Sequence, residues 1–594
     1  MTTSSHIGRF RLNRSWYWLS PFLLIALFLI LRQIYPYLGL PTAIFLSSVL
    51  MWISLASAWS AFSAHTDYWN LGVVVFWGLG AYTAGFAGQA AALFGLNSSN
   101  AALSLFQALP PAIFAGALMG LLIGALTLHL SRTAFALMTL VLAWIAHTLL
   151  TGIGWQIPIS PVQPGEIYTA LLVFATLGLL LNMWLYRSQW GATLMLIRED
   201  ERLAASQGVN INAVKIAMLS ISGGLTAAIG CIMAYDSSYI SPDTALPFAL
   251  VPVTLACAIL GGYRHPWGPV IGALVLVSTS TVLPNVSMLL VITTLVLFIC
   301  VRFMPQGILG YLDPIGRWSL AISVSKSATT LPTNEMHTAL PYPVSGDVDN
   351  ASYQPDAPPV LIVRDMNYNV EALQVLTSVN IHVLRGQAIG LVGPHDSGKS
   401  AILDCISGFT RAQSADIFLL SEDITHLPPW LINRYGLVRT FTPVRLFKSL
   451  TVLENLVVVR NWRGLSTWAW FTSFPDEIVN DAMQILRLIR LHELADVPAR
   501  QLSFEHQRLL MLGMVLMSRP HIVLLDEPSA GMSDASCDEL ARLVRRLRIE
   551  YGLAFLITDS NLRFVSRVCD QILVLRSGRI VAEGTASEIA EQAS

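Results

Sequence analysis

The sequence is poor in charged residues, and this scarcity excludes an ordinary soluble protein. Only 12% of its 594 residues are Asp, Glu, Lys or Arg, whereas 54% are hydrophobic. The mean hydropathy is +0.58. The formal net charge of −1 leaves no basic excess that would favour nucleic acid as a partner. We therefore expect a large part of the chain to lie in lipid.

The sequence also lacks cysteine and histidine patterns of known chemical meaning. Its six cysteines show no CxxC spacing, and its histidines are scattered without the spacing of metal ligands. Free, buried thiols are the expected state. No protein metal site is expected beyond Mg²⁺ at a nucleotide.

Residues 1–311 carry apolar runs long enough to cross a membrane as helices, and they predict an all-α polytopic membrane domain with about ten spans. The basic residues from Arg9 to Arg302 fall on one side of these spans, except Arg32. Because cytoplasmic loops collect Lys and Arg, both termini are expected in the cytoplasm. No small-residue cleavage site follows the basic start, so the first helix is expected to be retained. We place the spans near residues 19–35, 39–62, 71–95, 105–128, 134–154, 167–186, 213–234, 246–262, 267–284 and 286–303.

The composition changes sharply after the apolar runs. Residues 312–357 are rich in Ser, Thr, Pro, Asn and Asp, a composition that cannot bury a core and that predicts a flexible linker. Residues 358–594 alternate short β-like runs with amphipathic helical stretches. This pattern predicts an α/β domain of the P-loop kind.

One motif in this domain predicts a phosphate site. It fits G-x-x-x-x-G-K-[ST], follows the apolar run Ala388–Val392 and leads into a helical stretch. Its backbone N–H groups are suited to ATP phosphates, Lys399 to the β- and γ-phosphates and the Ser400 hydroxyl to Mg²⁺. The motif consists of Gly393, Pro394, His395, Asp396, Ser397, Gly398, Lys399 and Ser400.

Two adjacent acids end a second apolar run, Ile522–Leu525. A buried strand would deliver both carboxylates to its C-terminal edge. Asp526 is expected to organise Mg²⁺, and Glu527 to polarise the water that attacks the terminal phosphate. An apolar run that ends in two acids is by itself often only the end of a strand. Together with the phosphate loop, however, the acids predict an ATPase site with Glu527 as its catalytic residue.

The domain resembles the ATP-binding subunit of branched-chain amino acid ABC importers. The resemblance lies in RYGLVRTFTPVRLFKSLTVLENL (434–456), LLDEPSAGM (524–532) and DQILVLRSGRIVAEGT (570–585). It implies an ABC-type ATP-binding fold that uses ATP and Mg²⁺. It also places Tyr368 where an aromatic residue stacks on adenine.

The membrane half resembles the partner permease of the same importers. The shared segments are GLGAYTAG (78–85), GALTLHLSRTAFALMTLVLA (124–143), WGATLMLIREDERLAASQGVNINAVK (190–215) and LGGYRHPWGPVIGA (260–273). Residues 191–208 look like the coupling helix that docks on the ATPase. Gly78, Gly80 and Gly85 are open to two interpretations: they break a helix to expose backbone dipoles, or they allow close helix packing.

The chain departs from this family at residues expected to contact nucleotide. Thr442 replaces the glutamine that follows RTF, and Ser560 replaces the switch histidine that contacts the γ-phosphate. The signature sequence L-S-G-G-Q is Leu502-Ser503-Phe504-Glu505-His506, so an acid replaces a glycine. These departures predict ATP binding at a degenerate ATPase site.

Two functional hypotheses follow from these observations. The first is an importer subunit in the bacterial inner membrane that carries branched-chain amino acids or small polar amides and urea. It would work with a second permease, a second ATP-binding subunit and a periplasmic binding protein. The alternative is a membrane sensor or scaffold that binds ATP without hydrolysing it.

Overall fold

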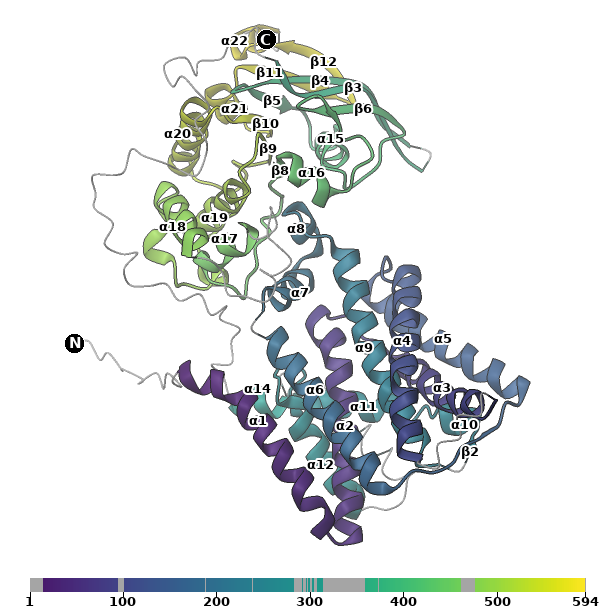
Figure 1. Ribbon diagram of the computed structural model, residues 1–594. Coiled ribbons are helices and arrows are strands. Elements are labelled where there is room, and N and C mark those ends of the chain that lie inside the picture. Colours follow the sequence, from purple (N-terminus) through teal and green to yellow (C-terminus); the bar gives the residue numbers. More distant parts are fainter. Residues whose placement is uncertain are drawn as a thin grey trace, which may run out of the picture. The chain divides into compact units, whose positions relative to one another are not determined.

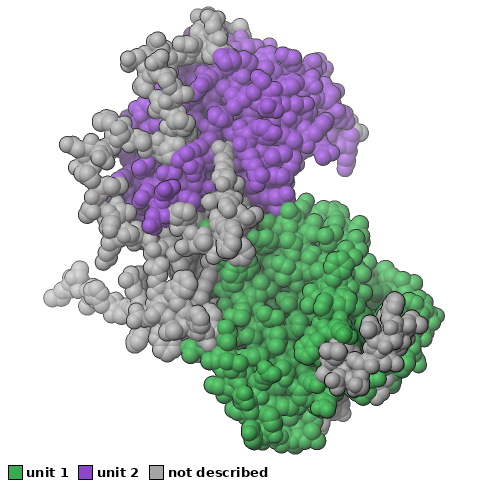
Figure 2. All heavy atoms as spheres, viewed as in Figure 1, with its two compact units in different colours: residues 1–198, 212–317 green, residues 199–211, 318–594 purple. Residues whose placement is uncertain are grey.

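The structure is a computed structural model of the chain. It describes residues 14–93, 101–186, 188–237, 239–282, parts of 291–312, 358–371, 373–460 and 476–592. The chain divides into two compact units, coloured separately in Figure 2: unit 1 is formed by 1–198 and 212–317, and unit 2 by 199–211 and 318–594. The linker expected at 312–357 lies outside the described residues, apart from Leu312.

Unit 1 is helical, and each span expected up to residue 284 contains a helix (Figure 1). Within the described residues, six helical stretches are long and apolar enough to cross a membrane, and three apolar helices are shorter. The span expected at 286–303 lies largely outside the described residues. The helices are α1 (Arg14–Ile34), α2 (Leu40–Thr66), α3 (Val73–Leu93), α4 (Ala101–Thr127), α5 (Arg132–Ile153), α6 (Pro164–Leu185), α7 (Gln189–Glu199), α9 (Ile211–Ala234), α10 (Pro242–Ala245), α11 (Leu250–Gly261), α12 (Gly268–Val282) and α14 (Gly307–Leu312).

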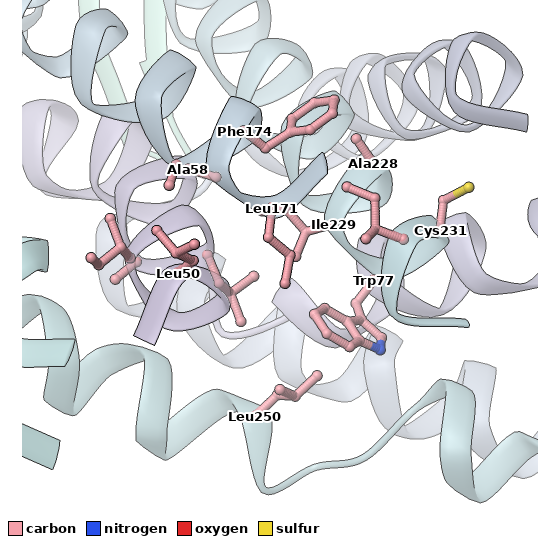
Figure 3. Close-up of a cluster of buried hydrophobic side chains, with 14 of the residues drawn as sticks. Leu50, Ala58, Trp77, Leu171, Phe174, Ala228, Ile229, Cys231 and Leu250 are labelled. Atoms are coloured by element: carbon pink, nitrogen blue, oxygen red, sulfur yellow. The ribbon is translucent and has the colours of Figure 1, made fainter. Parts of the chain in front are cut away.

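A buried apolar cluster holds the helices of unit 1 together. Figure 3 shows Leu50 of α2, Leu171 of α6 and Ile229 of α9 in this cluster. Polar side chains link the same helices: the Asn182 amide of α6 donates to the Ser57 carbonyl of α2 at 2.9 Å. Such bonds and close packing hold membrane helices together, because lipid gives little hydrophobic driving force between helices.

The glycines of α3 serve close packing rather than a break in the helix. The helix is continuous over Val73–Leu93. A Cβ atom at Gly80 would lie 1.8 Å from the Ala227 carbonyl oxygen of α9, and one at Gly78 would lie 2.5 Å from Leu246. A Cβ at Gly85 would lie 2.8 Å from Ile157. Of the two interpretations of these glycines, the structure supports close packing.

The described part of unit 2 contains two sheets (Figure 1). The first has the order β12-β11-β5-β10-β9-β8 and is parallel except for β12, and the second is antiparallel with the order β4-β3-β6-β7. The strands are β3 (Pro359–Val370), β4 (Leu373–Leu384), β5 (Ala388–Val392), β6 (Ser414–Leu419), β7 (Glu422–Asp423), β8 (Leu437–Arg439), β9 (Ile522–Asp526), β10 (Ala554–Thr558), β11 (Gln571–Arg576) and β12 (Arg579–Gly584). The helices are α8 (Glu201–Ser206), α15 (Lys399–Ile406), α16 (Pro429–Tyr435), α17 (Val452–Arg460), α18 (Asp476–Leu488), α19 (Phe504–Met517), α20 (Asp534–Tyr551), α21 (Leu562–Val568) and α22 (Ala586–Gln592).

The parallel sheet positions the nucleotide motifs. Every residue of β5, β9 and β10 is buried, as expected of strands covered on both faces. Because parallel strands end at one edge of a sheet, the loops after these three strands lie side by side. The phosphate-loop motif follows β5, and the two carboxylates lie where β9 ends.

Candidate nucleotide site

The phosphate-loop motif connects β5 to the first turn of α15. Lys399 is the first residue of α15, and its ammonium group donates to the carbonyl oxygens of Gly393 and Pro394, at 2.7 Å for Pro394. Gly398 has a φ of +101°, in the left-handed region that favours glycine. The Ser400 side chain is exposed. The loop therefore presents its backbone and the Ser400 hydroxyl at the N-terminus of a helix, where anions are favoured.

Four carboxylates act electrostatically on the Lys399 ammonium group. Burial lowers the pKa of Lys399, and the charges of Glu527, Asp559, Asp526 and Asp396 oppose this by raising it. These acids come from loops after β9 and β10 and from the phosphate loop itself. The structure thus brings together the motif and the two acids that the sequence had predicted to share a site.

Glu527 is held in an unusual backbone conformation at the end of β9. Its φ is +42°, which is uncommon for a residue with a side chain. Its N–H donates to the Thr558 carbonyl at 2.8 Å, and its carbonyl accepts from the Arg508 guanidinium at 2.6 Å. Conformations of this kind cost about 1–3 kcal/mol and cluster at functional sites. The neighbouring strand and the Arg508 side chain therefore hold the Glu527 backbone in this conformation.

Arg439 is a residue of this site that the sequence interpretation missed. It ends β8, is 5% exposed, and donates to the Asp526 carboxylate at 3.0 Å and to the Asp404 carboxylate of α15. The second Asp526 oxygen accepts from the Thr558 hydroxyl at 3.1 Å. Both oxygens of Asp526 therefore have protein partners. The only sequence signal was the arginine itself, which begins the segment Arg439-Thr440-Phe441 at the end of a short apolar run.

The residues present fit Mg²⁺ as a partner of bound phosphate. Among the described residues, no three His, Cys, Asp or Glu side chains come together as a metal site. Ser400 and Asp526 supply hard oxygen atoms, which Mg²⁺ prefers, and such ions take most of their other ligands from water and phosphate. A cation here would depend on the nucleotide for its coordination.

Thr442, Ser560 and Tyr368 lie around this site. The Thr442 hydroxyl donates to the Asp526 carbonyl at 2.7 Å, so it is directed to the strand end. Ser560 is exposed and follows the buried Asp559, which accepts from the Ser529 hydroxyl at 2.8 Å. Tyr368 is half-buried on β3 of the antiparallel sheet.

Tyr368 is connected to the phosphate loop through the adjacent strand. It lies opposite Leu376 of β4 in the strand register. A Cβ atom at Gly398 would lie 2.7 Å from the Leu376 side chain. Tyr368 is therefore one strand away from the end of the loop.

The signature segment begins α19, and Glu505 turns toward a neighbouring helix of its own unit. Ser503 caps α19 by accepting from the His506 N–H at 3.3 Å. The Glu505 carboxylate accepts from the N–H and hydroxyl of Ser533, at 3.3 and 3.0 Å, at the start of α20. Hydrogen bonds from Ser536 and Ser533 lower the pKa of Glu505. Glu505 is thus held at the start of α20 by hydrogen bonds, although it is exposed.

Residues 199–211 belong to the same compact unit as the α/β domain and make polar contacts with it. Asp200 caps α8 and forms an ion pair with Arg445 at 2.6 Å. The Ser206 carbonyl accepts from the Asn433 amide at 2.6 Å, and Gln207 accepts from the Ser518 hydroxyl at 3.1 Å. This segment is the second half of the predicted coupling region.

Comparisons with known proteins match both parts of the chain. A family described as branched-chain amino acid transport system / permease component matches residues 42–301, and the ABC transporter family matches residues 376–530. The high-affinity branched-chain amino acid transport ATP-binding protein BraF of Pseudomonas aeruginosa is 32% identical over 238 residues, which cover 39% of this chain and 93% of that protein.

Two further relatives match the same region. The high-affinity branched-chain amino acid transport ATP-binding protein LivG of Escherichia coli is 31% identical over 238 residues, or 39% of this chain and 93% of that protein. A crystal structure of the ADP conformation of an ATP-binding cassette of an ABC transporter is 32% identical and covers 40% of this chain and 94% of that one, with a TM-score of 0.36.

Proposed function

This chain belongs to the branched-chain amino acid transport family of ABC transporters, and on that premise we propose that it is one subunit of an ATP-driven importer. It joins a permease domain and an ABC-type ATP-binding domain in one polypeptide. The solute is proposed to be a branched-chain amino acid or a related small polar compound such as an amide or urea. The observation that carries the proposal is the phosphate loop between β5 and α15, beside the acids at the end of β9, in a chain whose described residues include six helical stretches long and apolar enough to cross a membrane.

The proposed nucleotide site assigns one role to each part of the loop cluster. Residues 393–400 cradle the ATP phosphates, and Ser400 and Asp526 hold Mg²⁺, which offsets phosphate charge when bound. Glu527 polarises the attacking water. Tyr368 stacks on adenine. Thr442 and Ser560 occupy the positions that face the γ-phosphate end.

We propose that hydrolysis at this site is slow. Thr442 donates to a backbone carbonyl beside the site, and a threonine is too short to reach further. Ser560 has no imidazole to offer the γ-phosphate. Glu505 presents a carboxylate where the family has glycine, and its negative charge would repel a nucleotide held by a facing domain.

Assembly and orientation follow from the same proposal. One permease domain and one ATP-binding domain per chain require a second copy of each, together with a periplasmic binding protein that delivers the solute. The distribution of Arg and Lys supports an inner-membrane protein with its N-terminus and ATP-binding domain in the cytoplasm.

Residues 199–211 would transmit movement between the domains through the Asp200–Arg445 ion pair and the Ser206–Asn433 hydrogen bond.

A second candidate is a membrane sensor that binds ATP without hydrolysis. The Glu505 carboxylate and the absence of an imidazole at Ser560 favour it. Such a protein would bind ATP in the assembled complex but would not move solute.

The deciding experiment is ATP turnover by the complex in lipid with its partners and binding protein. Wild type is compared with Glu527→Gln, with the equivalent change in the partner ATPase and with Glu539→Gln, an exposed acid paired with Arg490 on the surface. If the change in the partner ATPase abolishes turnover and Glu527→Gln does not, the site in this chain is slow and regulatory. Loss with Glu527→Gln contradicts the degenerate site, and no turnover in any form supports the sensor.

A further inference from the structure

The phosphate loop carries a histidine that contacts the proposed catalytic acid. The His395 Nδ1 atom lies 3.8 Å from the Glu527 Oε1 atom. The imidazole is 81% exposed, whereas the Glu527 side chain is 18% exposed. Across the described residues, no other basic side chain comes within 4 Å of the Glu527 carboxylate. The pair therefore joins the loop after β5 to the loop after β9.

The position of Glu527 identifies the part of the site in which His395 lies. A carboxylate that polarises the attacking water must face the terminal phosphate of ATP. A side chain within 4 Å of that carboxylate consequently lies at the γ-phosphate end of the site. With Nδ1 directed to Glu527, the Nε2 atom on the other side of the ring remains available for a phosphate oxygen.

The charges around the site favour a further hydrogen-bond donor to phosphate there. Asp396, Asp526, Glu527 and Asp559 all act on Lys399. A γ-phosphate adds negative charge beside these acids, and like charges repel each other more strongly outside bulk water.

The buried arginines near the site are already committed to other partners. Arg439 binds Asp526 and Asp404, and Arg508 binds the Glu527 carbonyl. His395 carries no comparable commitment beyond Glu527, and its exposure leaves the ring accessible to a ligand.

We propose that His395 binds the γ-phosphate of ATP through Nε2 while its Nδ1 faces Glu527, so that the site distinguishes ATP from ADP. This inference rests on the proposed function, in which unit 2 binds ATP. The loop histidine thereby provides, from within the phosphate loop, the imidazole that is absent at Ser560.

The test measures ATP and ADP affinity of the full-length chain in lipid nanodiscs by titration calorimetry, with Mg²⁺ and with EDTA. His395→Asn should weaken ATP binding about tenfold and leave ADP binding within about twofold, because a charged hydrogen bond to the third phosphate is lost. His395→Arg should keep the preference for ATP, since it keeps a long side chain that can donate to phosphate. His426→Asn, at an exposed histidine beside Asp423, is the matched control and should change neither affinity.

The outcomes separate the inference from the proposed function. If wild type binds ATP but does not prefer it over ADP, or if His395→Asn keeps the preference, the inference is wrong and the proposed function survives. An equal loss of ATP and ADP affinity, or an Arg variant that behaves like the Asn variant, also overturns it. If wild type binds neither nucleotide, both proposals fail.

Discussion

The buried contact between Arg439 and Asp526 gives the sharpest stability prediction. Replacing Arg439 with methionine keeps a long, flexible side chain but removes the guanidinium. The Asp526 carboxylate, 4% exposed, then keeps only the Thr558 hydroxyl as a side-chain partner. Leaving one member of a buried ion pair uncompensated costs about 3–5 kcal/mol. We expect about 3 kcal/mol, because the Asp404 side chain is 32% exposed and regains water.

The effect is measured by native-state hydrogen exchange of the full chain in detergent. A loss of about 3 kcal/mol in opening free energy accelerates exchange roughly a hundredfold. The acceleration should appear in peptides covering 437–442 and 522–526, which contain β8 and β9. Peptides of unit 1 should exchange as in wild type.

Two further variants separate this contact from a general effect of losing an arginine. Arg546→Met removes an exposed ion pair with Glu550, in which the side chains are 55% and 47% exposed, and should cost at most about 0.5 kcal/mol. Asp526→Asn in the Arg439→Met background removes the unpaired charge and should recover part of the lost protection. If Arg439→Met exchanges no faster than Arg546→Met, the assignment of a buried, compensating charge to Arg439 is refuted.

Three other predictions concern packing, coupling and thiol reactivity. Gly80→Ala should abolish accumulation of assembled protein in membranes, because its Cβ atom would overlap a carbonyl of α9, whereas Gly152→Ala, with open space around it, should accumulate normally by immunoblot. Asp200→Arg should uncouple ATP turnover from solute uptake in vesicles, and adding Arg445→Asp should restore part of the coupling; equal uptake in all three forms would exclude a role for the ion pair. Burial raises the pKa of Cys405 to about 12, so at pH 8 roughly one thiol in ten thousand is ionised, and maleimide should label it only after unfolding.

Local sequence patterns were sufficient to predict the helices and the loop motifs. Each apolar run up to residue 284 contains a helix, because a run of about 20 apolar residues has few alternatives in lipid. The phosphate loop lies between β5 and α15, and the two acids end the buried strand β9. Glycines at a strand-to-helix turn and acids after an apolar run are set by neighbours in sequence, so they can be recognised without the fold.

Such local patterns could not predict contacts between segments that are far apart in the sequence. The sequence showed that the acid Glu505 replaces a glycine, but it did not show that Ser533 holds this carboxylate. Nor did it show that β8 places Arg439 between Asp404 and Asp526.

What the sequence determined by itself is the kind of chain this is: membrane helices followed by an α/β domain with a phosphate loop and two acids. Only the tertiary structure decided that the glycines of α3 pack against α9, that Arg439 neutralises Asp526 and that His395 faces Glu527. The physical reason is the range of the interactions. Hydropathy and turn geometry act between neighbours along the chain, whereas close packing and charge pairing depend on which strands and helices become adjacent when the chain folds.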